Sequence, residues 1–423
     1  MIKILLPAAI IVLLVAAFFI RPSDEGQPYA PYFESLNKEL RSGYHAHPVL
    51  VLDLDLLDRN IETLMNHVGS PGRYRIVAKS LPSLKLIDYI SKKTGTNKVM
   101  VFHQPFINLM AEKFPRLEML LGKPMPIGAV RTFYANLKVG APFDPARQIQ
   151  WLVDSEARLM QYLAFAREKR IKLSINIEID VGLHRGGLRD TSELDRMLLI
   201  IRENPNNLTF TGFMGYEAHI SKAPPLLSSQ NKALKKAIKT YGFFVEHGRK
   251  NFPDLFNKEL TFNSAGSTTY QLYKDIDLIN DISVGSGLLK PTDFDVPTLA
   301  DHVPALFIAT PVLKKSPGLR IPYLEFLSPF WGLVNPNWKM THFIYGGYWK
   351  ALYHQPPGMR KNSIYGSSSN QEIATSSPGT ALSVDDFVFL RPTQSEAVML
   401  QFGDVLVLRN GKVVESWPVF TSE

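Results

Sequence analysis

Residues 74–79 read YRIVAK, a short and largely apolar run that ends at Lys79. Runs of this length, bounded by turn residues and alternating with helical patterns, are typical of the parallel strands of βα units. Three later runs end in small or charged residues: EIDVG at 178–182, SAGSTT at 264–269 and SVGSG at 283–287. Because strand ends meet at one mouth of a βα barrel, we expect all four segments to lie together.

Strand and helix patterns alternate on either side of these runs. Helical periodicity is clear over residues 58–68 and 156–170, and strand-like apolar runs cover residues 149–153 and 173–180, among others. The alternation amounts to roughly eight βα units over about 230 residues, the usual size of a TIM-type barrel. We therefore predict an α/β fold built on a (β/α)8 barrel over residues 48–297.

The pattern changes after residue 297. Short apolar runs separated by turn signals replace the helices, and Asn410-Gly411 between two such runs is a two-residue hairpin signal. We predict a β-rich C-terminal domain over residues 298–423. Residues 23–47, which are punctuated by proline and glycine, are expected to be a linker.

The N-terminus carries an apolar stretch, residues 4–20, between Lys3 and Arg21. At 1.5 Å per residue, about 17 residues of helix come close to the ~30 Å hydrocarbon core of a bilayer. We predict that residues 1–22 form a transmembrane signal anchor, with a cleaved signal peptide as the alternative. The protein is then membrane-anchored, with its body in the periplasm or otherwise outside the cytoplasm, although the flanking charges set this orientation weakly.

The composition is that of a globular protein, with 45% hydrophobic and 20% charged residues in 423. The net charge of +8 includes four lysines that we interpret as the solvated face of one helix, with a weak attraction to anionic lipid as the alternative: Lys232, Lys235, Lys236 and Lys239. Nothing resembles a nucleic-acid-binding motif. The absence of cysteine excludes disulfides, thiolate nucleophiles and cysteine-ligated metals.

A lysine and small-residue turns at one barrel mouth suit pyridoxal phosphate (PLP). Lys79 ends a buried-looking strand, so we expect its amine to be partly desolvated and able to form a Schiff base with an aldehyde. The turns at 264–269 and 283–287 follow the expected seventh and eighth strands, where barrels bind phosphate through backbone N–H groups. Arg185 would face the pyridine nitrogen and keep it unprotonated, which makes the ring a weaker electron sink.

Each of these residues also has a plain structural interpretation. Lys79 could be an ordinary surface lysine, and the acids Glu178 and Asp180 could form a loop salt bridge. Tyr216, Glu217 and His219, which close another strand, could each be a satisfied polar group of the core. Their predicted meeting at one mouth is what favours a cofactor site.

The same segments resemble the motifs of a known family. Residues 75–80, RIVAKS, resemble the lysine motif of the fold-type III PLP enzymes of the D-threonine aldolase and D-serine dehydratase family, which are relatives of alanine racemase. Most of residues 48–420 takes part in the resemblance. Four further segments match in the same order: residues 177–187, 215–219, 266–269 and 411–419.

The resemblance implies a PLP-binding barrel and a β-domain, in a homodimer whose active site borrows from the partner, with a small amino acid as substrate. It implies that Lys79 carries PLP and acts as the base, that Arg185 faces the pyridine nitrogen, and that Tyr216 lies beside the ring. His219, in the same segment as Tyr216, is a further catalytic candidate. The resemblance also implies the residues that hold the phosphate: Ser267, Thr268, Gly285 and Ser286.

The chain departs from this family at the metal site. The aldolase and dehydratase members carry a histidine and a cysteine or aspartate where alignment on Arg391-Pro392 places Gln394 and Glu396. An amide is a poor ligand for zinc or manganese compared with imidazole. Two further histidines of the family are replaced by Ile373 and Val77. We therefore assign no metal ligand, and a divalent metal is doubtful.

Three functions stay open at this point. The leading hypothesis is a PLP-dependent racemase or D-amino acid lyase or deaminase that works through a Schiff base at Lys79, and the lost ligands favour chemistry without a metal. The second is a metal-dependent D-threonine aldolase or D-serine dehydratase with a remodelled metal site. The third is a non-catalytic barrel that binds PLP or an amino acid, which would give a spectral shift with amino acids but no product.

Overall fold

The computed structural model describes residues 21–420, except residues 44, 139, 141, 223–228 and 258. The predicted signal anchor at residues 1–22 lies almost wholly outside the described residues, so it stays a prediction. Among the residues that are described, no helix combines the length and the apolar character needed to span a membrane. The described chain divides into two compact units, which are taken in turn below.

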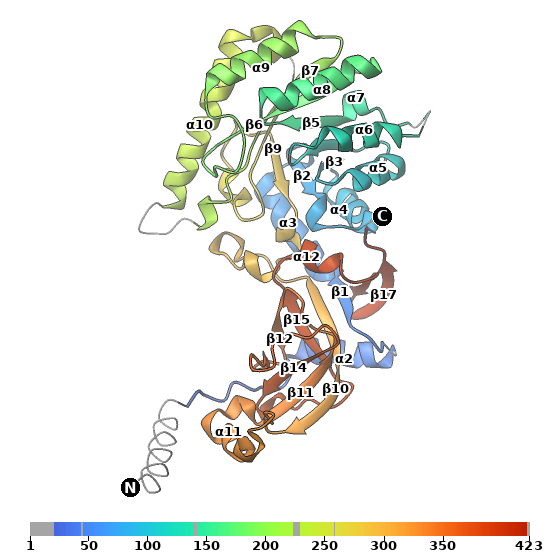
Figure 1. The fold of residues 1–423 in the computed structure, drawn as a ribbon, viewed down its shortest axis with the longest axis vertical. Coiled ribbons are helices and arrows are strands. Elements are labelled where there is room, and N and C mark those ends of the chain that lie inside the picture. The colour runs from blue at the N-terminus through green and yellow to red at the C-terminus, as the bar shows by residue number, and fades with distance from the viewer. Residues whose placement is uncertain are drawn as a thin grey trace. The chain divides into compact units, whose positions relative to one another are not determined.

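The first unit, Leu56–Val303 with the last residues of the chain, holds a closed barrel (Figure 1). Within the described residues eight strands close it, and neighbouring strands run parallel, including the closing pair of first and last. This confirms the predicted barrel. The strands are β2 (Tyr74–Val77), β3 (Lys98–Val101), β4 (Glu118–Leu121), β5 (Ile149–Val153), β6 (Leu173–Ile179), β7 (Leu208–Gly215), β8 (Thr261–Ser264) and β9 (Asp281–Val284).

Helices surround the barrel strands, and side-chain caps fix where several of them begin. The side chains of Ser155, Asp190 and Ser229 accept hydrogen bonds from backbone N–H groups in the first turn of the helix that follows. The helices are α3 (Leu54–Val68), α4 (Leu84–Thr94), α5 (Gln104–Lys113), α6 (Ile127–Ala135), α7 (Pro145–Gln148), α8 (Glu156–Lys169), α9 (Thr191–Glu203) and α10 (Gln230–Asn251).

The second unit is rich in β-structure, as predicted. It comprises Pro304–Trp417 and the described chain up to Asp55, and its described strands form a nine-stranded sheet with three helices, α2 (Pro31–Ser42), α11 (Ser328–Val334) and α12 (Ser395–Met399). The strands are β1 (Val49–Asp53), β10 (Leu306–Pro317), β11 (Met340–Tyr345), β12 (Ala351–Gln355), β13 (Arg360–Lys361), β14 (Gln371–Ser376), β15 (Phe387–Pro392), β16 (Val405–Arg409) and β17 (Lys412–Trp417).

The structure differs from the expected boundaries at two places. Strand β1 pairs with β10 and β16 of the second unit, although we placed it at the start of the barrel region. All five of its residues are buried, and such a uniformly buried strand gives no sign of which sheet it will join. Within the expected linker, α2 buries Phe33, Leu36 and Leu40. The predicted hairpin is present: Asn410 and Gly411 both have positive φ angles, of 52° and 71°, between β16 and β17.

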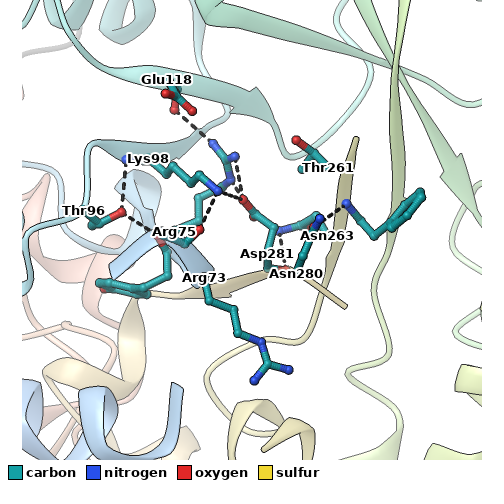
Figure 2. Close-up of polar contacts among 12 residues, drawn as sticks. Arg73, Arg75, Thr96, Lys98, Glu118, Thr261, Asn263, Asn280 and Asp281 are labelled. Carbon is teal, nitrogen blue, oxygen red and sulfur yellow. Dashed lines mark hydrogen bonds and ion pairs between the residues drawn. The ribbon is translucent and has the colours of Figure 1, made fainter. Parts of the chain in front are cut away.

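The N-terminal end of the barrel interior holds a buried ion pair (Figure 2). Arg75 donates from Nε and Nη2 to the two carboxylate oxygens of Asp281, at 2.7 and 2.8 Å. Their side chains are 1% and 0% exposed. Asn263 donates to the same carboxylate at 2.6 Å, and the Nζ of Lys98 lies 3.4 Å from it. Burial alone would raise the pKa of Asp281, but Arg75 and Lys98 outweigh that effect and hold it below its usual value.

Candidate active site

Lys79 lies in a turn of 3-10 helix, η2 (Ala78–Ser80), directly after β2 at the C-terminal end of the barrel. Its Nζ lies 4.9 Å from the ring centroid of Phe102, which follows the neighbouring strand β3. Ala78 and Ser80 are both buried, whereas the Lys79 side chain between them is exposed. The expectation of partial desolvation is therefore wrong, because the turn directs the flanking side chains inward and Lys79 outward.

The two small-residue turns at the ends of β8 and β9 lie together, as predicted. The hydroxyl of Ser267 accepts hydrogen bonds from the backbone N–H groups of Gly285, at 3.3 Å, and Gly287, at 2.9 Å. The hydroxyl of Ser286 donates to that of Ser80 at 2.8 Å. Since Ser80 is the neighbour of Lys79, the lysine-bearing turn and both small-residue turns share one side of the barrel mouth.

Close approach explains glycine at two positions of these turns. A Cβ at Gly285 would lie 2.8 Å from the carbonyl oxygen of Val77, and a Cβ at Gly266 would lie 2.7 Å from the ring of Tyr216. In the turn at 264–269, the amides of Ser267 and Thr268 have no acceptor among the described residues. Amides presented in this way suit an anionic group such as a phosphate.

Arg185 and Tyr216 form a pair beside these turns. The Cζ of Arg185, in the loop after β6, lies 5.0 Å from the ring centroid of Tyr216, which follows β7. At this distance the cation is attracted by the face of the ring. Because Tyr216 also packs on Gly266, the ends of β6, β7 and β8 are joined through these residues.

Asp180 has a structural part in the loop that carries Arg185. Its carboxylate accepts from the backbone N–H groups of Gly182, at 3.1 Å, and His184, at 2.9 Å. It also contacts the His184 ring at 2.9 Å and Arg189 at 3.1 Å. Burial would raise the pKa of Asp180, but the hydrogen bonds from His184 lower it overall. The loop salt bridge is therefore present, with Arg189 as the arginine.

Glu178 lies two residues before Asp180, within β6, with the backbone of Gly186 nearby. Burial, followed by the charge of Asp154, raises the pKa of Glu178 to about 7, and Arg185 partly opposes the rise. A carboxyl with this pKa exchanges protons near neutral pH.

This raised pKa predicts that Glu178→Gln changes the melting temperature by an amount that depends on pH. The carboxyl ionises at about 4.3 in an unfolded chain and at about 7 when folded. The folded state thus loses stability as pH rises through this window. We expect Glu178→Gln to melt at a higher temperature than the natural protein at pH 8 and at the same temperature at pH 4. Melting curves across this range, with the exposed Glu203→Gln as control, test it; a pH-independent difference would contradict it.

His219 lies beside the Asp180 loop. A Cβ at Gly182 would lie 3.3 Å from its ring, and its Nδ1 is buried with no hydrogen-bond partner in the described part of the chain. Burial, together with nearby His184, lowers the pKa of His219. The ring is therefore held neutral at physiological pH and can accept a proton.

One residue at the mouth, Phe102 near Lys79, was missed by the sequence analysis because it had no distinguishing pattern. Glu217 was predicted only as a polar residue that closes a strand and could be a satisfied group of the core. Glu217 is fully buried and hydrogen-bonded to the turn after β8. Its hydrogen-bond donors could not be predicted, because they lie 47 to 52 residues away in the sequence.

The residues at the family's metal positions lie in the second unit. Gln394 precedes α12 as its N-cap, and Glu396 lies in the first turn. Glu372, in β14, accepts hydrogen bonds from the Tyr353 hydroxyl and the Tyr348 amide, each at 3.2 Å. Three or more histidine or carboxylate side chains suited to a metal ion do not gather anywhere in the described chain. Independence from metal stays a prediction.

Comparisons with known proteins agree with the fold. Residues 52–249 match the family model for the alanine racemase N-terminal domain. No curated protein matches the chain. Similar solved structures include D-threonine aldolase from Filomicrobium marinum, with 16% identity, a TM-score of 0.69 and coverage of 88% of this chain and 96% of that chain.

Two further structures are similar over most of the chain. D-threo-3-hydroxyaspartate dehydratase from Delftia sp. HT23 has 16% identity and a TM-score of 0.66, over 89% of this chain and 98% of that one. Alanine racemase from Bacillus anthracis has 14% identity and a TM-score of 0.65, and it also covers 89% of this chain and 98% of its own. The predicted resemblance to fold-type III PLP enzymes is therefore confirmed, and at these identities the structural likeness is one of fold.

Proposed function

We propose that this chain is a PLP-dependent enzyme that acts on a small amino acid, with Lys79 as the residue that carries the cofactor. The main support is the meeting, at one barrel mouth, of four features: the lysine-bearing turn, the turn at 264–269 with two amides that have no acceptor among the described residues, the turn at 283–287 hydrogen-bonded to it, and an arginine packed on a tyrosine. The family match over residues 52–249, which hold strands β2 to β7 of the barrel, supports the same class of enzyme.

The residues at this mouth fit the parts of PLP. Lys79 would hold the aldehyde, Arg185 would face the pyridine nitrogen, and Tyr216 would lie beside the ring. When bound, PLP supplies an electron sink for charge at the Cα of an amino acid, and an arginine at the ring nitrogen makes that sink weaker. The phosphate would be held through amides and hydroxyls of Ser267, Thr268, Gly285 and Ser286.

The protein's own contribution is to move protons at the substrate. We propose that the Lys79 amine takes the proton from the substrate Cα. Tyr216, which carries a hydroxyl, is the candidate to return a proton, and His219, which burial holds neutral, is a candidate to accept one. The Asp180 loop would keep Arg185 in place through its hydrogen bonds to Gly182 and His184.

Turnover is expected to survive removal of divalent metal. Gln394 and Glu396 stand where the resembling family has its ligands, and an amide with one carboxylate makes a weak site. Dialysis against EDTA should leave the rate within about twofold of the untreated enzyme, because a site this weak cannot hold an essential metal. Loss of turnover that Zn²⁺ or Mn²⁺ restores would overturn the prediction and favour the second hypothesis.

That second hypothesis, a metal-dependent lyase with a remodelled site, is supported by the likeness to the aldolase and the dehydratase. The third, a non-catalytic barrel, would show ligand-dependent spectra without product. Incubation of the PLP-loaded protein with D- and L-amino acids, followed by assays for keto acid, aldehyde and enantiomer, separates the three. A homodimer, anchoring through residues 4–20 and a location outside the cytoplasm also stay predictions.

A further inference from the structure

Glu217 is a buried acid that joins the ends of two barrel strands. It follows Tyr216 after β7 and is 0% exposed. Its Oε1 accepts from the hydroxyl of Thr269 at 2.6 Å. Its Oε2 accepts from the hydroxyl of Ser264 at 2.9 Å and from the backbone N–H of Ala265 at 3.3 Å. All three donors belong to residues 264–269, the last residue of β8 and the turn that follows it.

This turn contains a backbone conformation that needs support. Ala265 has a φ of +70°, in the left-handed region that residues other than glycine disfavour. Ala265 is also buried, so its amide needs a partner inside the protein. The Glu217 carboxylate is that partner, and it thereby stabilises the strained residue.

The same carboxylate sets which amides of the turn are free. The hydroxyl of Thr269 donates to Glu217 and accepts from the amide of Gly266 at 3.1 Å. The carbonyl of Gly266 in turn accepts from the amides of Thr269 and Tyr270, at 3.0 and 2.9 Å. The turn is thus closed on its inner side, and the amides of Ser267 and Thr268 are the ones left without an acceptor among the described residues.

Burial of a carboxyl group costs desolvation free energy, so the presence of Glu217 at this position indicates a role beyond occupying space. Burial raises the pKa of Glu217, and the hydrogen bonds from Thr269 and Ser264 oppose that rise. Leucine or glutamine would fill this space without that cost but would not offer two acceptor oxygens to three donors.

We propose that Glu217 is a positioning residue that holds the turn of residues 264–269 in the shape that binds the phosphate of PLP. This inference rests on the proposed function. The inference goes beyond that function in one specific claim. Glu217 should determine how strongly the protein prefers PLP to pyridoxal, which has the same ring and aldehyde but no phosphate.

The test measures dissociation constants of PLP and pyridoxal by absorbance titration on the full chain. The natural protein should bind PLP more tightly than pyridoxal. Glu217→Gln keeps the volume but replaces one acceptor oxygen by a donor, so it should weaken PLP binding about tenfold, the effect of losing one good contact, and pyridoxal binding less than about twofold. Circular dichroism and melting curves check that the variant is folded.

A second pair of variants keeps the test decisive if Glu217→Gln does not fold. Thr269→Val removes the hydroxyl that bonds to Glu217 at nearly constant volume and should reproduce the selective loss. Thr269→Ser keeps the hydroxyl and should retain the preference for PLP. Equal weakening of both ligands, or an unchanged preference in Glu217→Gln and Thr269→Val, would overturn the role of Glu217 while the proposed function stands. No binding of PLP by the natural protein would overturn both.

Discussion

Replacement of Lys79 by alanine is expected to lower turnover by at least on the order of 10³-fold, since the variant loses both the amine that holds the cofactor and the proposed base. Lys79 follows β2, and its neighbour Ser80 is hydrogen-bonded to the turn after β9, which is bonded in turn to the turn after β8. Other groups at the mouth could still bind the phosphate and ring, so the variant should retain PLP weakly but not turn over an amino acid.

The control for this experiment is Lys92→Ala. Lys92 lies on α4, is largely exposed and pairs with Asp88 one helical turn away. Its removal should leave turnover unchanged. Full activity of Lys79→Ala, or an equal loss in both variants, would contradict the role given to Lys79.

Replacement of Arg75 by alanine is expected to destabilise the fold by about 3–5 kcal/mol. The variant leaves the carboxylate of Asp281 buried with Lys98 as its nearest cation, at 3.4 Å, and it frees the carbonyls of Val99 and Glu118 that Arg75 bonds at 3.0 Å. Urea denaturation followed by circular dichroism measures the change in unfolding free energy.

An exposed arginine gives the matched control. Arg196 pairs with Glu156 at 2.9 Å, with both side chains largely in solvent. Pairs of this kind contribute about 0–1 kcal/mol, so Arg196→Ala should have little effect.

The effect of Arg75→Ala should also shrink in acid, because the pKa of Asp281 is lowered in the folded protein. Stability from such a group is present above the unfolded pKa of about 3.9 and is lost as pH falls through the folded value. Equal losses in the two variants would contradict the account of the ion pair.

The barrel could be predicted because most of its strands are short apolar runs that alternate with helical patterns, and the structure has eight strands in chain order around the barrel. Strand β1 could not be assigned, because its five residues are all buried and a uniform pattern does not specify a partner sheet. The pairing of Arg75 with Asp281 could not be predicted from the sequence either. The two residues are 206 positions apart and meet only because β2 and β9 close the barrel.

The candidate site was predictable where backbone geometry restricts the residue type. Gly266 and Gly285 are required by close approach to Tyr216 and Val77, and small residues at strand ends mark such contacts in a sequence. The exposure of Lys79 was not predictable, because it depends on how the turn after β2 orients one side chain. The role of Glu217 depends on three donors in a distant turn, which no local pattern encodes.

The central claim is that Lys79 carries PLP, and chemical trapping tests it most directly. The protein is loaded with PLP, reduced with borohydride and digested with trypsin, and the labelled peptide is identified by mass spectrometry. Trypsin does not cleave after a modified lysine, so the account predicts the label on residues 76–85, IVAKSLPSLK, with the modification at Lys79. A label at another lysine, or none after reduction of protein that shows the absorbance of bound PLP, would contradict it.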